Sequence, residues 1–289
     1  MRRAFFQLHL AVILAGFTAI LGKLIHLNEG VLVWYRLFFS IIILGGWMTY
    51  RQKIQKISWL DFTKIAGVGT VLALHWVTFY GAVKYANASV AVVCISAAGF
   101  FSALLEPMFF RKKISFVELA LGMMSMAGVY LIFEFHPHFQ TGIIFGVLAA
   151  LGSAIFPIFN KELLHKHSAE VLTLYEFIGG LIGLTILLPV YFFISPADTW
   201  TLTATDFVWL LVMAGFCTVA AFDLQMNALK KISAFTVNLT YNLEPVYGVA
   251  LAIIFLKEGE MLTQHFFLGI AIIILSILLQ MFRLSKMGK

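Results

Sequence analysis

The chain has 289 residues, of which 61% are hydrophobic and 12% are charged, and its formal net charge is +6. Soluble globular domains carry about 25% charged residues, so this composition excludes an ordinary soluble protein. Apolar stretches of about 20 residues, long enough to cross a bilayer core, recur along the whole chain. We therefore expect an all-α polytopic membrane protein.

Ten apolar segments are predicted as transmembrane helices, because an isolated span in lipid satisfies its own backbone hydrogen bonds only as a helix. They divide into two runs of five, and an odd number of helices per run requires the second run to insert upside down. We therefore predict two inverted five-helix repeats, covering residues 5–133 and 141–283. The predicted helices are 5–22, 30–50, 62–82, 88–110, 115–133, 141–159, 169–194, 206–228, 233–255 and 264–283.

The lysine and arginine residues predict the orientation of these helices. With the N-terminus in the cytoplasm, sixteen of them fall on the cytoplasmic side, and only Lys23, Lys84 and Lys257 fall outside; Arg36 lies within a helix. Cytoplasmic loops of membrane proteins carry an excess of Lys and Arg. We therefore expect both termini in the cytoplasm and a multi-pass protein of the cell (inner) membrane. The positive charge then reflects topology and does not indicate nucleic acid as a partner.

Several residues recur at matching places in the two halves, at a spacing that drifts slowly because the loops differ in length. Lys84 and Lys230 each follow the third helix of their half, and Lys84 is predicted outside and Lys230 inside, as inversion requires. The matched pairs are Lys23 and Lys161, Tyr35 and Tyr175, Asp61 and Asp206, Lys84 and Lys230, and Gly122 and Gly269.

The tripeptide Leu-Glu-Pro occurs in both halves, but its two copies do not match. Aligning Glu106 with Glu244 spoils the flanking pairs, whereas the better register sets Ala98 against Pro245. Glu106 is then expected near the cytoplasmic end of its helix and Glu244 near the middle of its own. The two glutamates are therefore predicted to have different roles.

The C-terminal half carries a recognisable pattern in residues 242–247 (Asn-Leu-Glu-Pro-Val-Tyr), 255–260 (Phe-Leu-Lys-Glu-Gly-Glu) and 268–269 (Leu-Gly). In these residues, and in the ten-helix count, five-plus-five repeat and cytoplasmic termini, the chain resembles the EamA-type family of the drug/metabolite transporter (DMT) superfamily. The first half departs from the pattern, with Ala98 in place of the proline and Lys113 in place of the acid. The resemblance implies export of amino acids or other small metabolites and leaves the cargo open.

Ionisable side chains inside a bilayer cost about 2.5–3.5 kcal/mol on insertion scales, so each is a candidate for a functional site. Arg36 and Glu176 lie in the second helix of each half, at depths related by the inversion. An arginine can hold a carboxylate through two hydrogen bonds, and a glutamate can hold an ammonium or carry a proton. Together they are predicted to bind a zwitterion; the alternative is a structural ion pair.

Two further groups are candidates. Glu244 precedes Pro245, which frees a backbone carbonyl and suits a discontinuous helix beside a cavity, although a simple proline kink is the alternative. His75 can exchange a proton near neutral pH, although a neutral histidine bonded to a backbone carbonyl is the alternative. The predicted substrate-binding residues are Tyr35, Arg36, His75, Trp76, Tyr175, Glu176, Tyr241, Asn242 and Glu244.

Gly179 and Gly183 form a small-xxx-small pattern in the seventh predicted helix. Such patterns allow the backbones of two membrane helices to approach closely. We therefore expect this face of the helix to pack against another helix.

These features predict a secondary active transporter that exports amino-acid-like solutes by alternating access. No nucleotide-binding G-x-x-x-x-G-K-[ST] pattern is present in the sequence, so a gradient of protons or solute is the expected energy source. We expect no enzyme activity, no metal and no cofactor; the partners are a small-molecule substrate, protons as a candidate coupling ion, and the lipid bilayer. The alternatives are an intramembrane enzyme, although neither His-Glu-x-x-His nor Gly-x-Ser-x-Gly occurs, and a passive channel.

Overall fold

The computed structural model describes residues 2–132, 140–194, 200–244, 246–248, 250–251 and 264–287. The regular structure in these residues is helical, which confirms the all-α prediction for this part of the chain. The helices are α1 (Arg2–Leu24), α2 (Glu29–Tyr50), α3 (Trp59–Tyr85), α4 (Ala88–Ile95), α5 (Ala97–Phe109), α6 (Phe116–Ile132), α7 (Gln140–Leu163), α8 (Ala169–Ile194), α9 (Ala204–Ala214), the π-helix η2 (Gly215–Ala220), α10 (Ala221–Leu229), α11 (Ala234–Tyr241) and α13 (Gln264–Met287).

Seven described helical runs are long and apolar enough to cross a membrane. Two runs are composite: α4 and α5 join at Ser96, and α9, η2 and α10 follow one another directly. The shorter apolar stretches Phe116–Gly128 and Leu268–Arg283 fall in the fifth and tenth predicted segments, and α11 begins the ninth. Helix is thus described in each of the ten predicted segments, whereas Pro245 and residues 255–260 of the family pattern lie outside the described residues.

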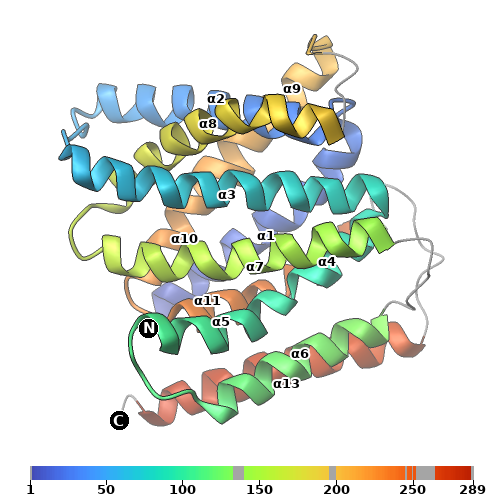
Figure 1. The fold of residues 1–289 in the computed structure, drawn as a ribbon. Helices are drawn as coiled ribbons and strands as arrows, with labels where there is room; N and C mark the ends of the chain where they lie inside the picture. Colours follow the sequence, from blue (N-terminus) through green and yellow to red (C-terminus); the bar gives the residue numbers. More distant parts are fainter. Residues whose placement is uncertain are drawn as a thin grey trace.

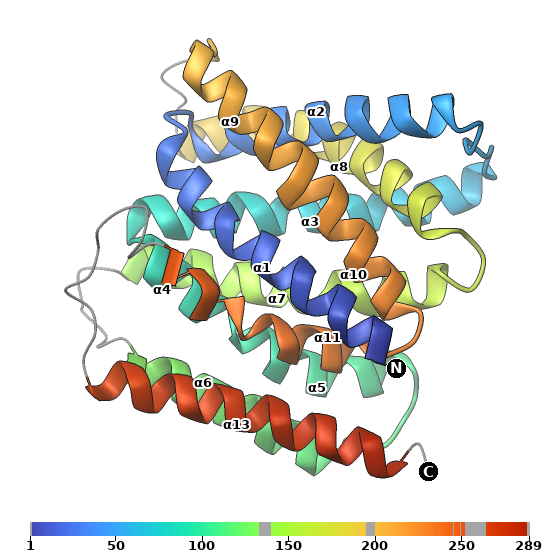
Figure 2. The same cartoon turned by 180° about the vertical axis from the view of Figure 1, so that it is seen from behind.

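Most of the helices lie roughly parallel to one another in a bundle, and α1 and the run from α9 to α10 cross them obliquely (Figures 1 and 2). α3 lies between α7 and α8 and packs against both, while α6 and α13 pair along one edge (Figures 1 and 2). The start of α1 and the end of α13 lie at the same end of the bundle in both views. This placement agrees with an even number of crossings of the bundle between the two ends.

Packing between the halves is exchanged. α3, the third helix of the first half, packs against α7 and α8, the first two helices of the second half. The run from α9 to α10, which is the third helix of the second half, packs in turn against α1 and α2. Such reciprocal contacts arise when two similar units pack around a two-fold axis.

The matched aspartates Asp61 and Asp206 make equivalent contacts. Each lies in the first turn of its helix and binds the Ser or Thr that caps the helix, which extends both helices slightly beyond the predicted starts. Lys166, from the connection between α7 and α8, lies 2.6 Å from Asp61 Oδ2. The backbone N–H of His26, from the connection between α1 and α2, donates to Asp206 Oδ1 at 3.1 Å. The exchange of contacts therefore extends to single side chains.

The backbones of α3 and α8 touch at glycine residues. A Cβ atom on Gly69 would lie 2.0 Å from the backbone oxygen of Glu176, and one on Gly179 would lie 2.2 Å from the Cα of Ala66. A Cβ atom on Gly183 would lie 2.2 Å from a threonine hydroxyl of α3. The predicted close packing of Gly179 and Gly183 is confirmed, and its partner is α3.

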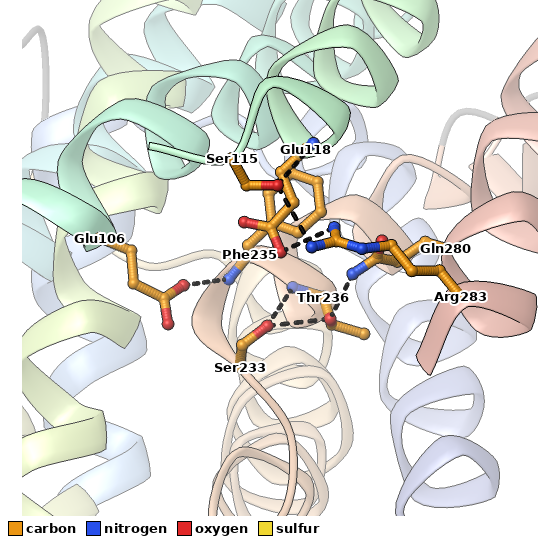
Figure 3. Close-up of polar contacts among 8 residues, drawn as sticks. All are labelled: Glu106, Ser115, Glu118, Ser233, Phe235, Thr236, Gln280 and Arg283. Carbon is orange, nitrogen blue, oxygen red and sulfur yellow. Dashed lines mark hydrogen bonds and ion pairs between the residues drawn. The ribbon is translucent and has the colours of Figure 1, made fainter. Parts of the chain in front are cut away.

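Polar contacts join α5, α6, α11 and α13 near one end of the bundle (Figure 3). The backbone N–H of Phe235, in the first turn of α11, donates to Glu106 at 2.8 Å. Arg283 of α13 forms an ion pair with Glu118 of α6 at 3.1 Å. Glu106 therefore holds the start of α11, where the free N–H groups of a helix favour a carboxylate. The other residues in this group are Ser115, Ser233, Thr236 and Gln280.

Candidate functional site

A cavity of about 70 Å³ lies within the bundle, lined by helices from both halves. Three departures from regular α-helix surround it: the break at Ser96, the π-helix η2, and the turn at Asn242 and Leu243 that ends α11. Irregular backbone at membrane depth is tolerated where it is buried in protein or lines a cavity, and π-helical turns are frequent at functional sites. The lining residues are Ala15, Thr18, Arg36, His75, Trp76, Phe79, Ile95, Ala98, Ser153, Phe156, Cys217, Ala221, Phe222, Gln225, Asn238, Tyr241 and Glu244.

Two of these breaks lie at matching places in the two halves. Ser96 and Leu243 are as far apart in the sequence as the matched glycines Gly122 and Gly269. The positions of the breaks therefore agree with the register that rejected the Leu-Glu-Pro alignment. Glu244 lines the cavity, whereas Glu106 does not appear among the lining residues.

Arg36 of α2 reaches the cavity from one side and is 2% exposed. All three guanidinium nitrogens donate hydrogen bonds: Nε to the Thr218 hydroxyl at 2.8 Å, Nη1 to the Tyr80 hydroxyl at 3.0 Å, and Nη2 to the Cys217 carbonyl at 3.3 Å. Its Cζ lies 3.7 Å from the centre of the Trp76 ring, a cation–π contact. These contacts fix the guanidinium in one place, and none of them neutralises its charge.

Glu244 reaches the same cavity from the segment that follows α11 and is 6% exposed. Within the described residues its carboxylate receives no hydrogen bond, and it forms no ion pair with Arg36 or any other cation. A buried carboxylate normally has a partner, because its desolvation is costly. The cavity thus presents a cation and an anion that do not neutralise each other by direct contact.

The predicted residues His75, Trp76 and Tyr241 also line the cavity. His75 Nδ1 lies 2.7 Å from the carbonyl oxygen of Ala149, and since a carbonyl only accepts, this nitrogen carries a hydrogen. Trp76 supplies the ring beneath the guanidinium, and the Tyr241 hydroxyl donates to the Gln225 side chain at 3.2 Å. These side chains give the cavity an aromatic wall with a few polar positions.

Four predicted residues lie elsewhere. The Tyr35 hydroxyl donates to the Trp200 carbonyl, and the Tyr175 hydroxyl to a carbonyl of the connection between α2 and α3, each at 2.9 Å. Neither lines the cavity, nor do Asn242 and Glu176, although both are almost fully buried. The structure therefore brings Arg36 together with Glu244 and not with Glu176.

Among the polar lining residues that the sequence prediction missed, two carry amide side chains. Gln225 of α10 and Asn238 of α11 both line the cavity, and the Asn238 amide donates to the Ser102 hydroxyl at 2.6 Å. Each is an uncharged amide within an apolar segment, which is the signal that could have identified it. Among the described residues, no group of three or more His, Cys, Asp or Glu side chains is placed to hold a metal ion.

Comparison with known proteins gives two kinds of match. The sequence pattern of the EamA-like transporter family matches residues 2–134 and again residues 140–282. A protein of known crystal structure shares the fold, with a TM-score of 0.75 and 13% sequence identity over 99% of both chains.

Curated relatives carry the name "uncharacterized transporter". One from Clostridium kluyveri is 25% identical over 203 residues, which are 67% of this chain and 63% of the relative. One from Archaeoglobus fulgidus is 31% identical over 157 residues, covering 53% of this chain and 52% of the relative. A second from that organism is 28% identical over 239 residues, covering 78% and 79%. The first two alignments span less than two thirds of each relative.

Proposed function

Because this chain belongs to the EamA-like transporter family of the DMT superfamily, and is thus a multi-pass membrane protein, we propose that it is a secondary active carrier for small zwitterions resembling amino acids. The observation that carries this proposal is the pair of unlike charges, Arg36 and Glu244, that share one cavity without pairing. Arg36 would hold the carboxylate of the solute, and Glu244 its ammonium. The direction proposed is export across the cell (inner) membrane.

The two halves are proposed to be inverted, with the boundaries 5–133 and 141–283 and with both termini in the cytoplasm. The exchanged packing of α3 and of the α9–α10 run supports this arrangement, as does the position of the start of α1 and the end of α13 at one end of the bundle. Inverted repeats of this kind rock against each other around a central site. The cavity would then open to each side of the membrane in turn.

The side chains around the cavity favour a small solute. The cavity volume of about 70 Å³ holds only a few water molecules. Phe79, Phe156 and Phe222 add apolar surface beside the charged groups. Such a wall accepts a compact solute with an apolar side group more readily than a long, hydrated one.

Counterflow in proteoliposomes tests the proposal. Vesicles loaded with one unlabelled amino acid should take up its labelled form faster than empty vesicles, and uptake should saturate with external concentration. A panel of amino acids, their amines and their carboxylic acids would identify the solute. Linear, unsaturable flux without exchange would instead indicate a passive channel and would contradict the carrier.

Replacing Glu244 with glutamine should raise the concentration for half-maximal counterflow of a zwitterion at least about tenfold, which corresponds to roughly 1.4 kcal/mol. The amide keeps the shape of the side chain but removes the charge that would hold the ammonium. Counterflow of the carboxylic acid that lacks this ammonium should change little. Glu162→Gln, at the end of α7 and outside the cavity, is the control and should behave as the wild type. Equal losses for both solutes would contradict the role of Glu244.

A further inference from the structure

Glu176 is a second buried acid, distinct from the one in the cavity. It lies in α8, is 0% exposed, and neither of its carboxyl oxygens has a hydrogen-bond partner within the described residues. It is not among the residues that line the central cavity. A solute bound in that cavity would therefore not contact Glu176 and would not supply its missing partner.

Asn160 of α7 is the polar side chain that interacts electrostatically with the Glu176 carboxyl group, although it completes no hydrogen bond to either carboxyl oxygen. Asn160 Oδ1 likewise has no donor within the described part of the chain. The Asn160 amide nitrogen points at the sulfur of Met226 at 3.7 Å, and a thioether is a weak acceptor. Three buried oxygens thus lack a donor at one place in the bundle.

No cation compensates Glu176 within the described residues. Arg36 of α2 is held by three hydrogen bonds, His75 of α3 by Ala149, and Lys161 of α7 by the carbonyl oxygens of Leu229 and Ile232. Asp223, the ionisable residue of the neighbouring helix α10, is an acid and therefore cannot compensate the charge of Glu176. The remaining ionisable groups of α2, α3, α7 and α8, none of which forms an ion pair with Glu176, are Glu29, Tyr35, Tyr50, Asp61, Lys64, Tyr80, Lys84, Tyr85, Glu162, Glu170, Tyr175 and Tyr191.

An unpaired carboxylate in such a place is costly, whereas a neutral carboxylic acid is less so and brings the missing donor. We propose that Glu176 is the proton-binding site of this carrier, separate from the solute cavity and beside the Asn160 side chain. The inference rests on the proposed carrier function. An O–H bond forms on Glu176 when water on one side of the membrane supplies a proton, and it breaks when the proton passes to water on the other side.

A short chain of contacts connects this site with the solute cavity. The ring of Phe177, the next residue of α8, lies 6.1 Å from the Trp76 ring and 5.3 Å from the Phe222 ring, centre to centre. Both of these rings line the cavity, and Trp76 lies beneath the Arg36 guanidinium. A solute bound against Trp76 and Phe222 would therefore be connected through Phe177 to the part of α8 that carries Glu176.

The test uses the full-length protein in proteoliposomes that enclose a pH-sensitive dye. Wild-type protein should move protons when a solute gradient is applied. Glu176→Gln should keep solute counterflow within about threefold of the wild type and lose the proton movement. Glu170→Gln, on the same helix but ion-paired with Lys53 near its end, should keep both. Proton movement that persists in Glu176→Gln, or net solute movement by the wild type down an applied solute gradient without any proton movement, would overturn the assignment of Glu176.

A conservative variant covers the case in which Glu176→Gln does not fold. Glu176→Asp keeps the carboxyl group in a shorter side chain and should retain proton movement coupled to the solute; solute movement without protons in this variant overturns the proposal. Absence of wild-type counterflow for every zwitterion of the panel would contradict the carrier function itself. The two failures are therefore distinguishable.

Discussion

Replacing Arg36 with glutamine should lower the rate of counterflow at least about a hundredfold while leaving the protein inserted in the membrane. The guanidinium is the cation that lines the cavity at the proposed carboxylate position, and it is held there by Thr218, Tyr80 and Cys217. Removing one partner of a buried charged contact costs roughly 2–5 kcal/mol, and each 1.4 kcal/mol is a factor of ten. Initial rates of labelled uptake, normalised to the amount of monodisperse protein, measure the loss.

Two companion variants separate binding from folding. Arg51→Gln removes an arginine from the exposed end of the same helix and should transport as the wild type. Arg36→Lys keeps a positive charge but loses the planar group that binds a carboxylate with two hydrogen bonds, so an intermediate loss is expected. Wild-type rates in Arg36→Gln would refute the role of Arg36 in solute binding.

Replacing Gly69 with alanine should destabilise the protein by at least about 3 kcal/mol, at the upper end of the usual cost of overpacking. The added Cβ would lie 2.0 Å from the Glu176 backbone oxygen, and a backbone atom cannot move aside as a flexible side chain does. Because α3 packs against α7 as well as α8, the helix also has little freedom to shift. The apparent Tm in detergent, and the yield of monodisperse protein, should both fall.

Gly67→Ala is the matched control, two residues away on the same helix. A Cβ atom there meets nothing within 4 Å. Since alanine favours helix over glycine by about 1 kcal/mol, this variant should be as stable as the wild type or slightly more stable. A similar Tm for both alanine variants would show that the backbones of α3 and α8 are farther apart than the structure places them.

The candidate site was predicted in part. Arg36, His75, Trp76, Tyr241 and Glu244 line one cavity, and all five were identifiable as polar or aromatic side chains within apolar segments. Tyr35 and Tyr175, which match in the repeat, make equivalent hydrogen bonds: each donates to a backbone carbonyl in a connection of the other half. Both tyrosines lie away from the cavity. Repeat matching shows which residues are equivalent, and it does not show which of them face the cavity.

The sequence by itself determined the features that can be read from composition and spacing within single segments. Apolar segments of membrane length, the recurrence of Asp61 and Asp206, and the family pattern are all readable in order along the chain, because each depends on composition and local spacing. The glycine face of α8 could also be predicted from the sequence, because the spacing of Gly179 and Gly183 is enough to identify it.

Only the tertiary structure decided which acid shares the cavity with Arg36. Glu176 and Glu244 are equally unusual in the sequence, but the rotation of α8 turns one into the packed bundle, and the turn after Tyr241 brings the other to the cavity. Helix rotation and helix breaks are set by contacts between segments far apart in the chain, such as that between Gly69 and Glu176. Such contacts depend on how all the helices pack together, which hydropathy and spacing along one segment do not specify.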